Sequence, residues 1–538
     1  MIVNPFLNEL LQIIFNNLDE DIGSLFSLLF VNKNWCENAV PILWRRPLSY
    51  NRYNFEETTK IKKIIPILLS QISLQERIDL ELKDIPTKTM FDYVSFIKQF
   101  DISLLYWLVC EKYTMAISKT IFMKTKRLDE LTFLYEPYGD NLYESIFTLP
   151  KSQMLLNHIT KLKFDTIGKY SPFPNLSIHV KNIKCLSINF SCNSDNDNRK
   201  NVVKFFEDLV EFISVQNNLE YFIINIRSNI LSSIIHMEKW RGLFFKLSES
   251  HSIKYIMIKG CINGEQTDLN FLSNCSKLEE LHLDSMIIDY DQLVCLENIY
   301  LPKLFSFSLL GCYFISPKSN YDYRTNLWLT YITAFLMNHS NTLKELKIII
   351  RLETVKKNYL KSILDDLSLY CQNLTLIGLN LEHIFGYYVE YREKVEKVDE
   401  ILNEFKSFCN NCSNLQKIIL FSSKFYHFNL PKELLLIFIR SLPKTLKSLS
   451  FEGVIELDYL EEIIKNYIDN LINLDFYYYT CVKVLERDID EMTKNRKLKL
   501  SYDKKRISIN WTSIYRYFLD FNYPWLASHS MDGKVFNL

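Results

Sequence analysis

The stretch CSNLQKIIL at residues 412–420 has two close counterparts, CSKLEELHL at 275–283 and CQNLTLIGL at 371–379. Each copy begins with a Cys, and three residues later a Leu starts the template L-x-x-L-x-L. In this template, L stands for any apolar residue. The second and third apolar positions are two residues apart, which is the period of a strand with one buried face. The stretch therefore predicts a short strand wherever it recurs.

The template recurs along most of the chain. Helical periodicity fills several of the intervals between copies, at 202–217, 359–371 and 434–442. One strand and one helix per unit is the pattern of a stacked repeat, because a single unit cannot bury its own apolar side. Chance matches to so short a template are the alternative, and the number of copies argues against it. Eleven segments fit the template, with first apolar residues at 159, 183, 219, 253, 278, 304, 343, 374, 415, 446 and 474.

We therefore expect an α/β solenoid with short parallel strands on its concave side and helices on its convex side. Cys275, Cys371 and Cys412 would lie at helix-to-strand corners, where a small buried group fits. The uneven spacing of the copies predicts an irregular solenoid with inserted loops, one of them the polar run at 192–201.

Composition excludes several classes of protein. The chain has 538 residues, with 63 Lys and Arg balanced by 63 Asp and Glu, so there is no basic excess for a nucleic-acid partner. The longest early apolar run, at 25–31, is too short to span a membrane. Twelve scattered cysteines and an opening without a basic segment or a cleavage site predict a reducing compartment, cytoplasmic or nuclear.

The first fifty residues have a different pattern. Leu7, Leu10, Leu11, Ile14 and Phe15 follow helical spacing, a second helical pattern begins at residue 25, and a third ends at residue 44. Three short helices make only a very small core, and such a unit often leaves an apolar face for a partner.

Two segments in this region, ELLQIIFNNL at 9–18 and LLFVNKNWCENAVPILW at 28–44, resemble an F-box. The family typically opens with a Leu-Pro pair, which here is Phe6-Leu7. With the repeats, the chain resembles an F-box/leucine-rich-repeat protein. The resemblance implies an F-box at 1–48, a helical spacer at 49–150 that includes degenerate repeats as an option, and a leucine-rich-repeat solenoid with a C-terminal cap at 151–538.

Proteins of this architecture usually are substrate-recognition subunits of SCF-type ubiquitin ligases, in which the F-box docks on Skp1 and the repeats hold the target protein. The resemblance implies that Skp1, and through it a cullin–RING ligase, is the partner. The Skp1 contacts carry over to Phe6, Leu7, Leu10, Leu11 and Ile14. Two alternatives stay open: the helices are only a cap on the solenoid, or the chain is a leucine-rich-repeat scaffold without a ligase role.

A target protein would contact the strand residues that alternate with the buried ones. In the later repeats these positions include Lys347, Ile419, Phe421, Phe476 and Tyr478, and aromatic anchors often dominate binding energy. We expect the target to dock toward the C-terminal half. The alternative is that these aromatic residues pack under the segment 507–538.

No motif for catalysis or for a cofactor stands out. The C-x-x-C pair Cys409 and Cys412 has no second pair or His ligands at the spacing of a structural zinc site. His251 and His282 are isolated, and phosphate-loop, metalloprotease and hydrolase motifs do not occur. We expect a non-catalytic adaptor without metal or cofactor, while partner subunits perform the chemistry.

Overall fold

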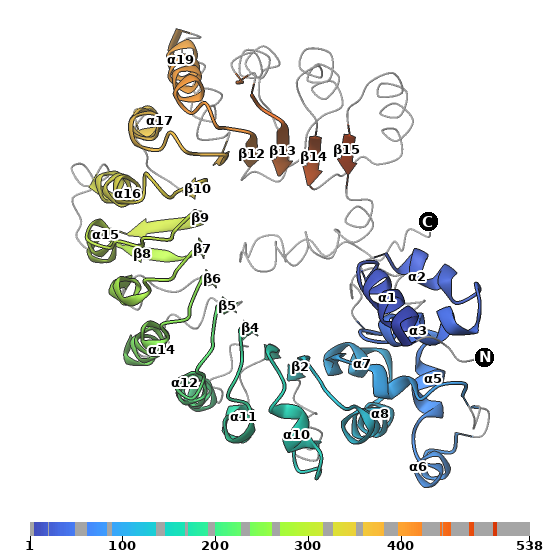
Figure 1. Ribbon diagram of the computed structural model, residues 1–538. Helices are drawn as coiled ribbons and strands as arrows, with labels where there is room; N and C mark the ends of the chain where they lie inside the picture. The colour runs from blue at the N-terminus through green and yellow to red at the C-terminus, as the bar shows by residue number, and fades with distance from the viewer. Residues whose placement is uncertain are drawn as a thin grey trace, which may run out of the picture. The chain divides into compact units, whose positions relative to one another are not determined.

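The computed structural model divides the chain into two compact units, one of residues 1–295 with 301–303 and one of residues 296–300 with 304–538 (Figure 1). Each unit is described by itself. The structure describes residues 5–19, 21–48, 62–82, 85, 89–135, 146–166, 171–191, 199–226, 237–260, 269–315, 327–350, 359–380, 396–421, 442–443, 445–452, 473–477 and 499–502.

Parallel strands form the inner layer of the first unit. Their buried residues alternate with half-exposed ones, as the template predicts, so that Leu162 and Phe164 are buried while Lys161 and Lys163 are exposed. Consecutive strands pair in the register of the template, with Leu162 opposite Leu186. The parallel strands are β1 Gln99–Asp101, β2 Glu130–Tyr135, β3 Lys161–Thr166, β4 Cys185–Phe190, β5 Tyr221–Ile226, β6 Tyr255–Lys259 and β7 Glu280–Asp284. The short strand β8 Ile287–Asp289 lies off this ladder.

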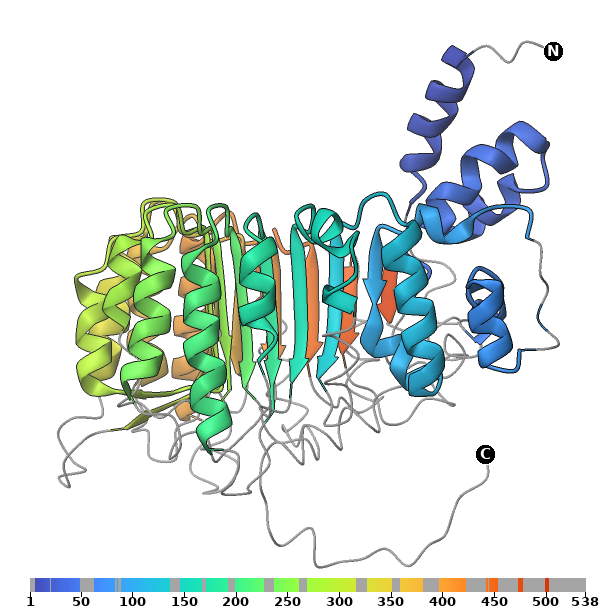
Figure 2. The same ribbon diagram turned by 90° about the horizontal axis from the view of Figure 1, so that it is seen from below.

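Helices form the outer layer of this unit, so the core lies between two layers (Figure 2). Phenylalanines from strands and helices fill that core; the ring of Phe173 is 5.0 Å from that of Phe164 and 5.2 Å from that of Phe212. The helices are α1 Pro5–Asn16, α2 Ile22–Leu28, α3 Lys33–Leu43, α5 Ile65–Ser70, α6 Leu74–Asp79, η1 Tyr93–Phe96, α7 Ile102–Leu108, α8 Glu111–Lys124, α10 Ser152–Leu156, α11 Phe173–His179, α12 Arg199–Ser214, α14 Met237–Glu249, η4 Leu269–Asn274 and α15 Tyr290–Glu297.

A repeated backbone contact joins neighbouring repeats at the start of each strand. The carbonyl oxygen of Thr160 accepts hydrogen bonds from the amides of Lys184 and Cys185, at 2.7 and 3.0 Å. The carbonyl of Lys184 accepts in the same way from Glu220 and Tyr221, at 2.9 and 2.8 Å. One carbonyl thus holds two amides of the next repeat, which sets the register before the strand begins.

The second unit repeats the same plan. The carbonyl of Lys344 accepts from the amides of Thr375 and Leu376, at 2.8 and 3.1 Å. Its elements are β9 Ser306–Ile315, α16 Leu327–Asn338, β10 Glu345–Ile350, α17 Tyr359–Tyr370, β11 Leu376–Asn380, α19 Glu396–Asn411, β12 Lys417–Phe421, β13 Ser448–Glu452, β14 Asn473–Tyr477 and β15 Lys499–Tyr502. Parallel strands with helices on one side, one set per repeat, are the leucine-rich-repeat solenoid that the template predicts.

Repeated structure begins earlier than residue 151. Strand β1 pairs in parallel with β2, and β2 with β3, so the stretch interpreted mainly as a helical spacer carries two strands of the ladder. The segments IKQFDI at 97–102 and LDELTF at 128–133 both fit the template. Their apolar residues are buried, Phe100 and Leu131 among them.

The last template copy is shifted from its predicted alignment. Leu474 pairs with Leu449, which is the second apolar position of the preceding copy, so this repeat starts at 471 with LINLDF and not at 474. Phe476 consequently shares the register of Phe451 and Leu420, the third apolar position of the template. The Phe476 side chain lies outside the description, and its contact with a target stays a prediction.

Within the described ranges, no helix combines the length and the apolar character that crossing a bilayer requires.

Candidate protein-interaction site

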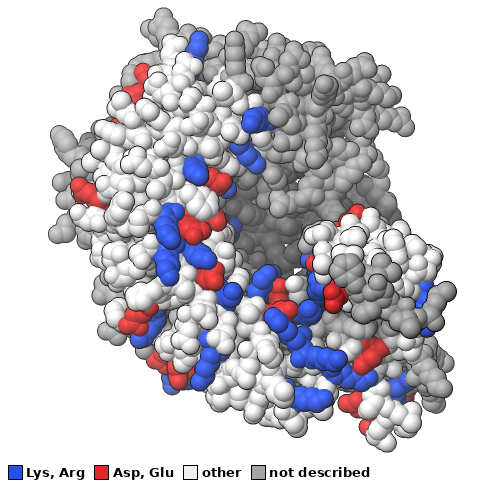
Figure 3. All heavy atoms as spheres, in the orientation of Figure 1, with Lys and Arg blue, Asp and Glu red and all other residues white. Residues whose placement is uncertain are grey.

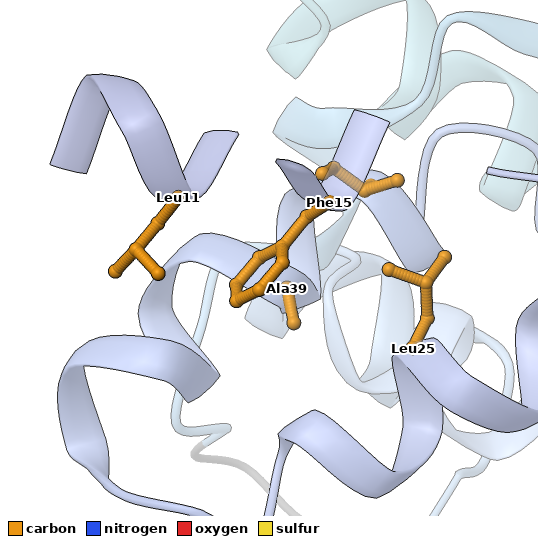
Figure 4. Packing of buried hydrophobic residues seen from close by; sticks show 5 residues of the cluster. Leu11, Phe15, Leu25 and Ala39 are labelled. Carbon is orange, nitrogen blue, oxygen red and sulfur yellow. The ribbon is translucent and has the colours of Figure 1, made fainter. Parts of the chain in front are cut away.

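The N-terminal helical unit, residues 5–48 with helices α1 to α3, has a core of its own (Figure 4). Leu11 and Phe15 of α1 are buried together with residues of α2 and α3, and the ring of Phe15 meets that of Trp35 edge-on at 5.4 Å. Leu11 and Phe15 are four residues apart and therefore share one face of the helix. Leu11, which the resemblance implied as a Skp1 contact, thus packs inside the unit, with 5% of its surface exposed.

Short polar side chains fix where α2 and α3 begin. Asp21 precedes α2 and accepts from the amide and the hydroxyl of Ser24, at 3.0 and 2.6 Å. These bonds to the hydroxyl and amide of Ser24 favour the carboxylate and lower the pKa of Asp21. Asn32 caps α3 by accepting from the amide of Trp35 at 2.9 Å. These two caps fix the starts of α2 and α3, and the packing of the three helices leaves other faces open.

Apolar side chains lie on those open faces. Leu10, Ile13 and Ile14 are exposed at 42, 60 and 53% and occupy one face of α1, because residues three and four apart are neighbours on a helix. Phe26 and Phe30, at the end of α2 and just after it, are exposed as well, with their rings 5.4 Å apart. Phe6 and Leu7 belong to α1, and their side chains lie outside the description.

Arg45 connects the N-terminal helical unit to the first repeat. Its carbonyl accepts from the amides of Lys98 and Gln99, at 2.8 and 3.0 Å, in the same two-to-one pattern that joins consecutive repeats. Its guanidinium donates to Asn16 at the end of α1, at 2.8 Å. Trp44 adds a ring contact to Tyr93, at 4.4 Å between centroids. The helical unit is thereby attached where a preceding repeat would be.

A second exposed surface lies on the strands of the first unit. We call it the strand face of β4–β7: the residues that alternate with the buried ones and point away from the helices. The rings of Tyr221 and Tyr255 are 6.0 Å apart, and His282 follows at 5.1 Å from Tyr255. Burial raises the pKa of Tyr255, and Tyr221 stays 41% exposed.

Comparison with known proteins adds little beyond the architecture. No family model matches the chain, and neither does any curated protein. Among solved structures, the chain is similar to an internalin of Listeria monocytogenes, at 13% identity over 67% of this chain and 93% of that one, with a TM-score of 0.29. It is also similar to the yeast complex of Rad7 and Elc1, at 12% identity over 83% of this chain and 94% of that one, with a TM-score of 0.37. Likeness at this level supports no conclusion about partners.

Of the five predicted target contacts in the second unit, Lys347 and Ile419 have described side chains. Ile419 occupies an outward position but is only 6% exposed, and its register neighbours Gly378 and Ser450 are buried too. The alternation of apolar and polar residues along a strand assigns each residue to one side of the sheet, but it does not show that this side is open to solvent. Because Ile419 is buried, its side chain is poorly placed to contact a target protein. Lys347 is half-exposed on β10, and its contact with a target stays a prediction.

Two of the predicted target contacts cannot be placed further. Phe421 ends β12, and its side chain is not described, while Tyr478 lies outside the described residues. The alternative packing under 507–538 also concerns residues outside the described ranges.

The cysteines at the repeat corners are buried apolar groups. The Cys412 thiol donates to the Cys371 carbonyl of the preceding repeat at 3.5 Å, and the Cys275 thiol donates to the Phe271 carbonyl at 3.7 Å. Burial raises the pKa of Cys275, Cys371 and Cys412 to about 12, and also raises that of Cys409. Across the ranges the structure describes, no three His, Cys, Asp or Glu side chains are grouped to hold a metal ion.

Proposed function

We propose that the chain is the substrate-recognition subunit of an SCF-type ubiquitin ligase. In this proposal the N-terminal helical unit docks on Skp1, and the repeats bind the target protein. The observation that supports it is the apolar face of α1, where Leu10, Ile13 and Ile14 are exposed on a unit that already has a closed core. The resemblance of this segment to an F-box supplies the identity of the partner.

Exposed apolar residues are common on proteins, so their arrangement matters more than their presence. Leu10, Ile13 and Ile14 form one helix face, and their burial against a partner would remove apolar surface from water at about 25 cal/mol per Å². Leu11 contributes by holding α1 in place, and Leu10 and Ile14 remain candidates for direct contact.

The attachment at Arg45 suits such a receptor. Ubiquitin transfer needs the target held at a fixed distance from the loaded enzyme, and holding two reactants in place accelerates reaction without any catalytic group on the holder. Hydrogen bonds from Lys98 and Gln99 to the Arg45 carbonyl continue the pattern between repeats, so backbone contacts tie the helical unit to the first strand.

The test is capture of purified Skp1 by the full chain, compared with the double variant Leu10→Asp, Ile14→Asp. Both side chains are exposed, so the variant should fold, while two carboxylates on the docking face are incompatible with an apolar contact. We expect the intact chain to bind Skp1 and the variant to lose at least about a hundredfold in affinity, the loss of two central apolar anchors.

A matched control is Leu74→Asp, Ile78→Asp on α6, which changes two exposed apolar residues at the same spacing, 69 and 61% exposed. This control should bind Skp1 like the intact chain. If the intact chain fails to bind Skp1, the ligase proposal fails, and the leucine-rich-repeat scaffold without a ligase role becomes the better description.

A further inference from the structure

The strand face of β4–β7 carries three rows of side chains that run across the strands. One row contains Tyr221, Tyr255 and Glu280, which are register partners on β5, β6 and β7. The next contains Ile223, Met257 and His282, and the third ends in Lys259 and Asp284. Each row therefore offers side chains from different repeats at the spacing of neighbouring strands, about 4.8 Å.

The first two rows form an aromatic and apolar platform. The rings of Tyr221, Tyr255 and His282 follow one another at 6.0 and 5.1 Å, and the Tyr255 hydroxyl reaches the Met257 sulfur at 3.5 Å. Tyr221 keeps 41% of its surface exposed, and Ile223 and Met257 are half-exposed. Such rings present large, rigid contact area at little cost in side-chain entropy.

The third row presents side-chain amides. Asn225 donates to Asn189 at 3.3 Å, and Asn189 donates to Asp165 at 2.5 Å. An Asn side chain has two N–H donors and an acceptor oxygen, and the bonds along the row use only part of this capacity. The remaining donors and acceptors match the needs of an extended backbone, which carries one N–H and one C=O per residue.

The charged side chains on this face contact one another or polar neighbours. Lys259 pairs with Asp284 at 2.7 Å, and His282 contacts Glu280 at 3.3 Å. Asp284 is also bonded by the Ser285 hydroxyl at 2.8 Å. The exposed Lys161 and Lys163 lie on β3, outside the rows over β4–β7. The Lys259 ammonium is thus already paired, and a phosphate or an acidic segment would find no unpaired cation among the described side chains of these rows. An uncharged segment brings no charge that would have to be desolvated on this face.

We propose that the strand face of β4–β7 binds an extended, uncharged peptide segment of the target protein, with an aromatic or aliphatic residue against Tyr221 and Tyr255 and its backbone along Asn189 and Asn225. The proposal rests on the proposed function in that the repeats hold the target. The three strand spacings from β4 to β7 cover roughly 14 Å, which an extended chain spans in about four residues. The site belongs to the first unit, whereas the predicted target contacts belong to the second.

The experiment is selection of random displayed peptides on the full chain, followed by affinity measurements with the recovered peptides. Two variants probe the site: Tyr221→Ala removes the most exposed ring, and Asn225→Asp replaces a side-chain amide of the third row by a carboxylate. We expect peptides rich in aromatic and aliphatic residues and poor in charge, whose affinity falls at least about tenfold with either variant. Tyr370→Ala on α17 is the matched control, since Tyr370 is 38% exposed, and it should leave affinity unchanged.

Each contrary outcome overturns the proposal. If no peptide is recovered, or if the recovered peptides bind the intact chain and all variants equally, then this face does not bind an extended segment. Binding by phosphorylated or acidic peptides alone contradicts the uncharged occupant. Self-association of the intact chain that Tyr221→Ala abolishes would make a second copy the occupant. Skp1 capture by the same variants is measured in parallel, so failure of peptide binding and failure of Skp1 docking are distinguished.

Discussion

At the scale of single residues, Gly260 shows how the lack of a side chain allows the turn that follows a strand. Gly260 directly follows β6 and has a φ of 123°, which L side chains rarely adopt, and its amide donates to the Asp284 carbonyl at 2.9 Å. A Cβ at this position would overlap the carbonyl group of Ile226. The position therefore requires glycine on two separate grounds.

Gly260→Ala should destabilise the first unit by at least about 1 kcal/mol, because the new methyl group strains the backbone and meets Ile226. The measurement is the midpoint of denaturant unfolding. Gly242→Ala on α14 is the control: its Cβ would lie 4.0 Å from Val210, an ordinary contact, and alanine favours a helix. Equal midpoints for the two variants would contradict the role given to Gly260.

Corner cysteines should resist alkylation. A thiolate is the reactive form, and burial that raises the pKa of Cys371 and Cys412 to about 12 keeps them protonated at pH 8. We expect iodoacetamide to label the exposed Cys110 quickly and these two only after denaturation, as peptide mass spectrometry would report. Their labelling should remain slow as the pH rises from about 7 to 9, because both values lie below the raised pKa. Labelling of Cys412 as fast as that of Cys110 would indicate a reactive site.

At the scale of elements, the two-to-one carbonyl contact explains why irregular repeats still stack. The intervals between strands differ in length, but every junction from Arg45 to Lys184 places one carbonyl against two amides of the next repeat. Loop length can therefore vary without disturbing the register. The N-terminal helical unit uses the same junction, although its own residues form no strand among those described.

The junction at Arg45 should loosen when Trp44 is shortened. Trp44→Ala removes the ring contact to Tyr93, a contact of the kind worth about 0.5–1.5 kcal/mol beyond area burial. We expect hydrogen exchange of the Lys98 and Gln99 amides to rise by up to about tenfold. The amides of Lys184 and Cys185 use the same type of junction further along and should be unchanged. Unaltered exchange at 98–99 would show that Trp44 does not support the junction.

At the scale of the whole molecule, charge is balanced locally as well as in total. Lys254 bonds to Glu220 at 2.8 Å and Lys184 lies 3.9 Å from the same carboxylate, so these three neighbouring repeats alternate in sign. Figure 3 shows basic and acidic residues lying beside one another at several places on the face that it draws. The hydrogen bond from Lys254, together with the two positive charges, lowers the pKa of Glu220. Alternation along the strand starts agrees with the absence of a basic excess in the composition.

The sequence by itself determined the repeat and most of its strands. The apolar template is a local pattern, and a period of two with one buried face specifies a strand without knowledge of its neighbours. The same template is present in the sequence at 97–102 and 128–133. The helical pattern of the surrounding residues made these two copies hard to recognise. The three N-terminal helices likewise follow from local spacing and from the caps at Asp21 and Asn32.

Only the tertiary structure decided register, burial and attachment. Leu474 fits two alignments in sequence, and pairing with Leu449 selects one of them. Leu11 and Ile419 are apolar residues with plausible contact roles, but neighbours contributed by other segments bury both. The carbonyl of Arg45 receives amides more than fifty residues away. These properties depend on contacts between segments that are far apart in the sequence. Periodicity within one segment carries no information about such long-range contacts.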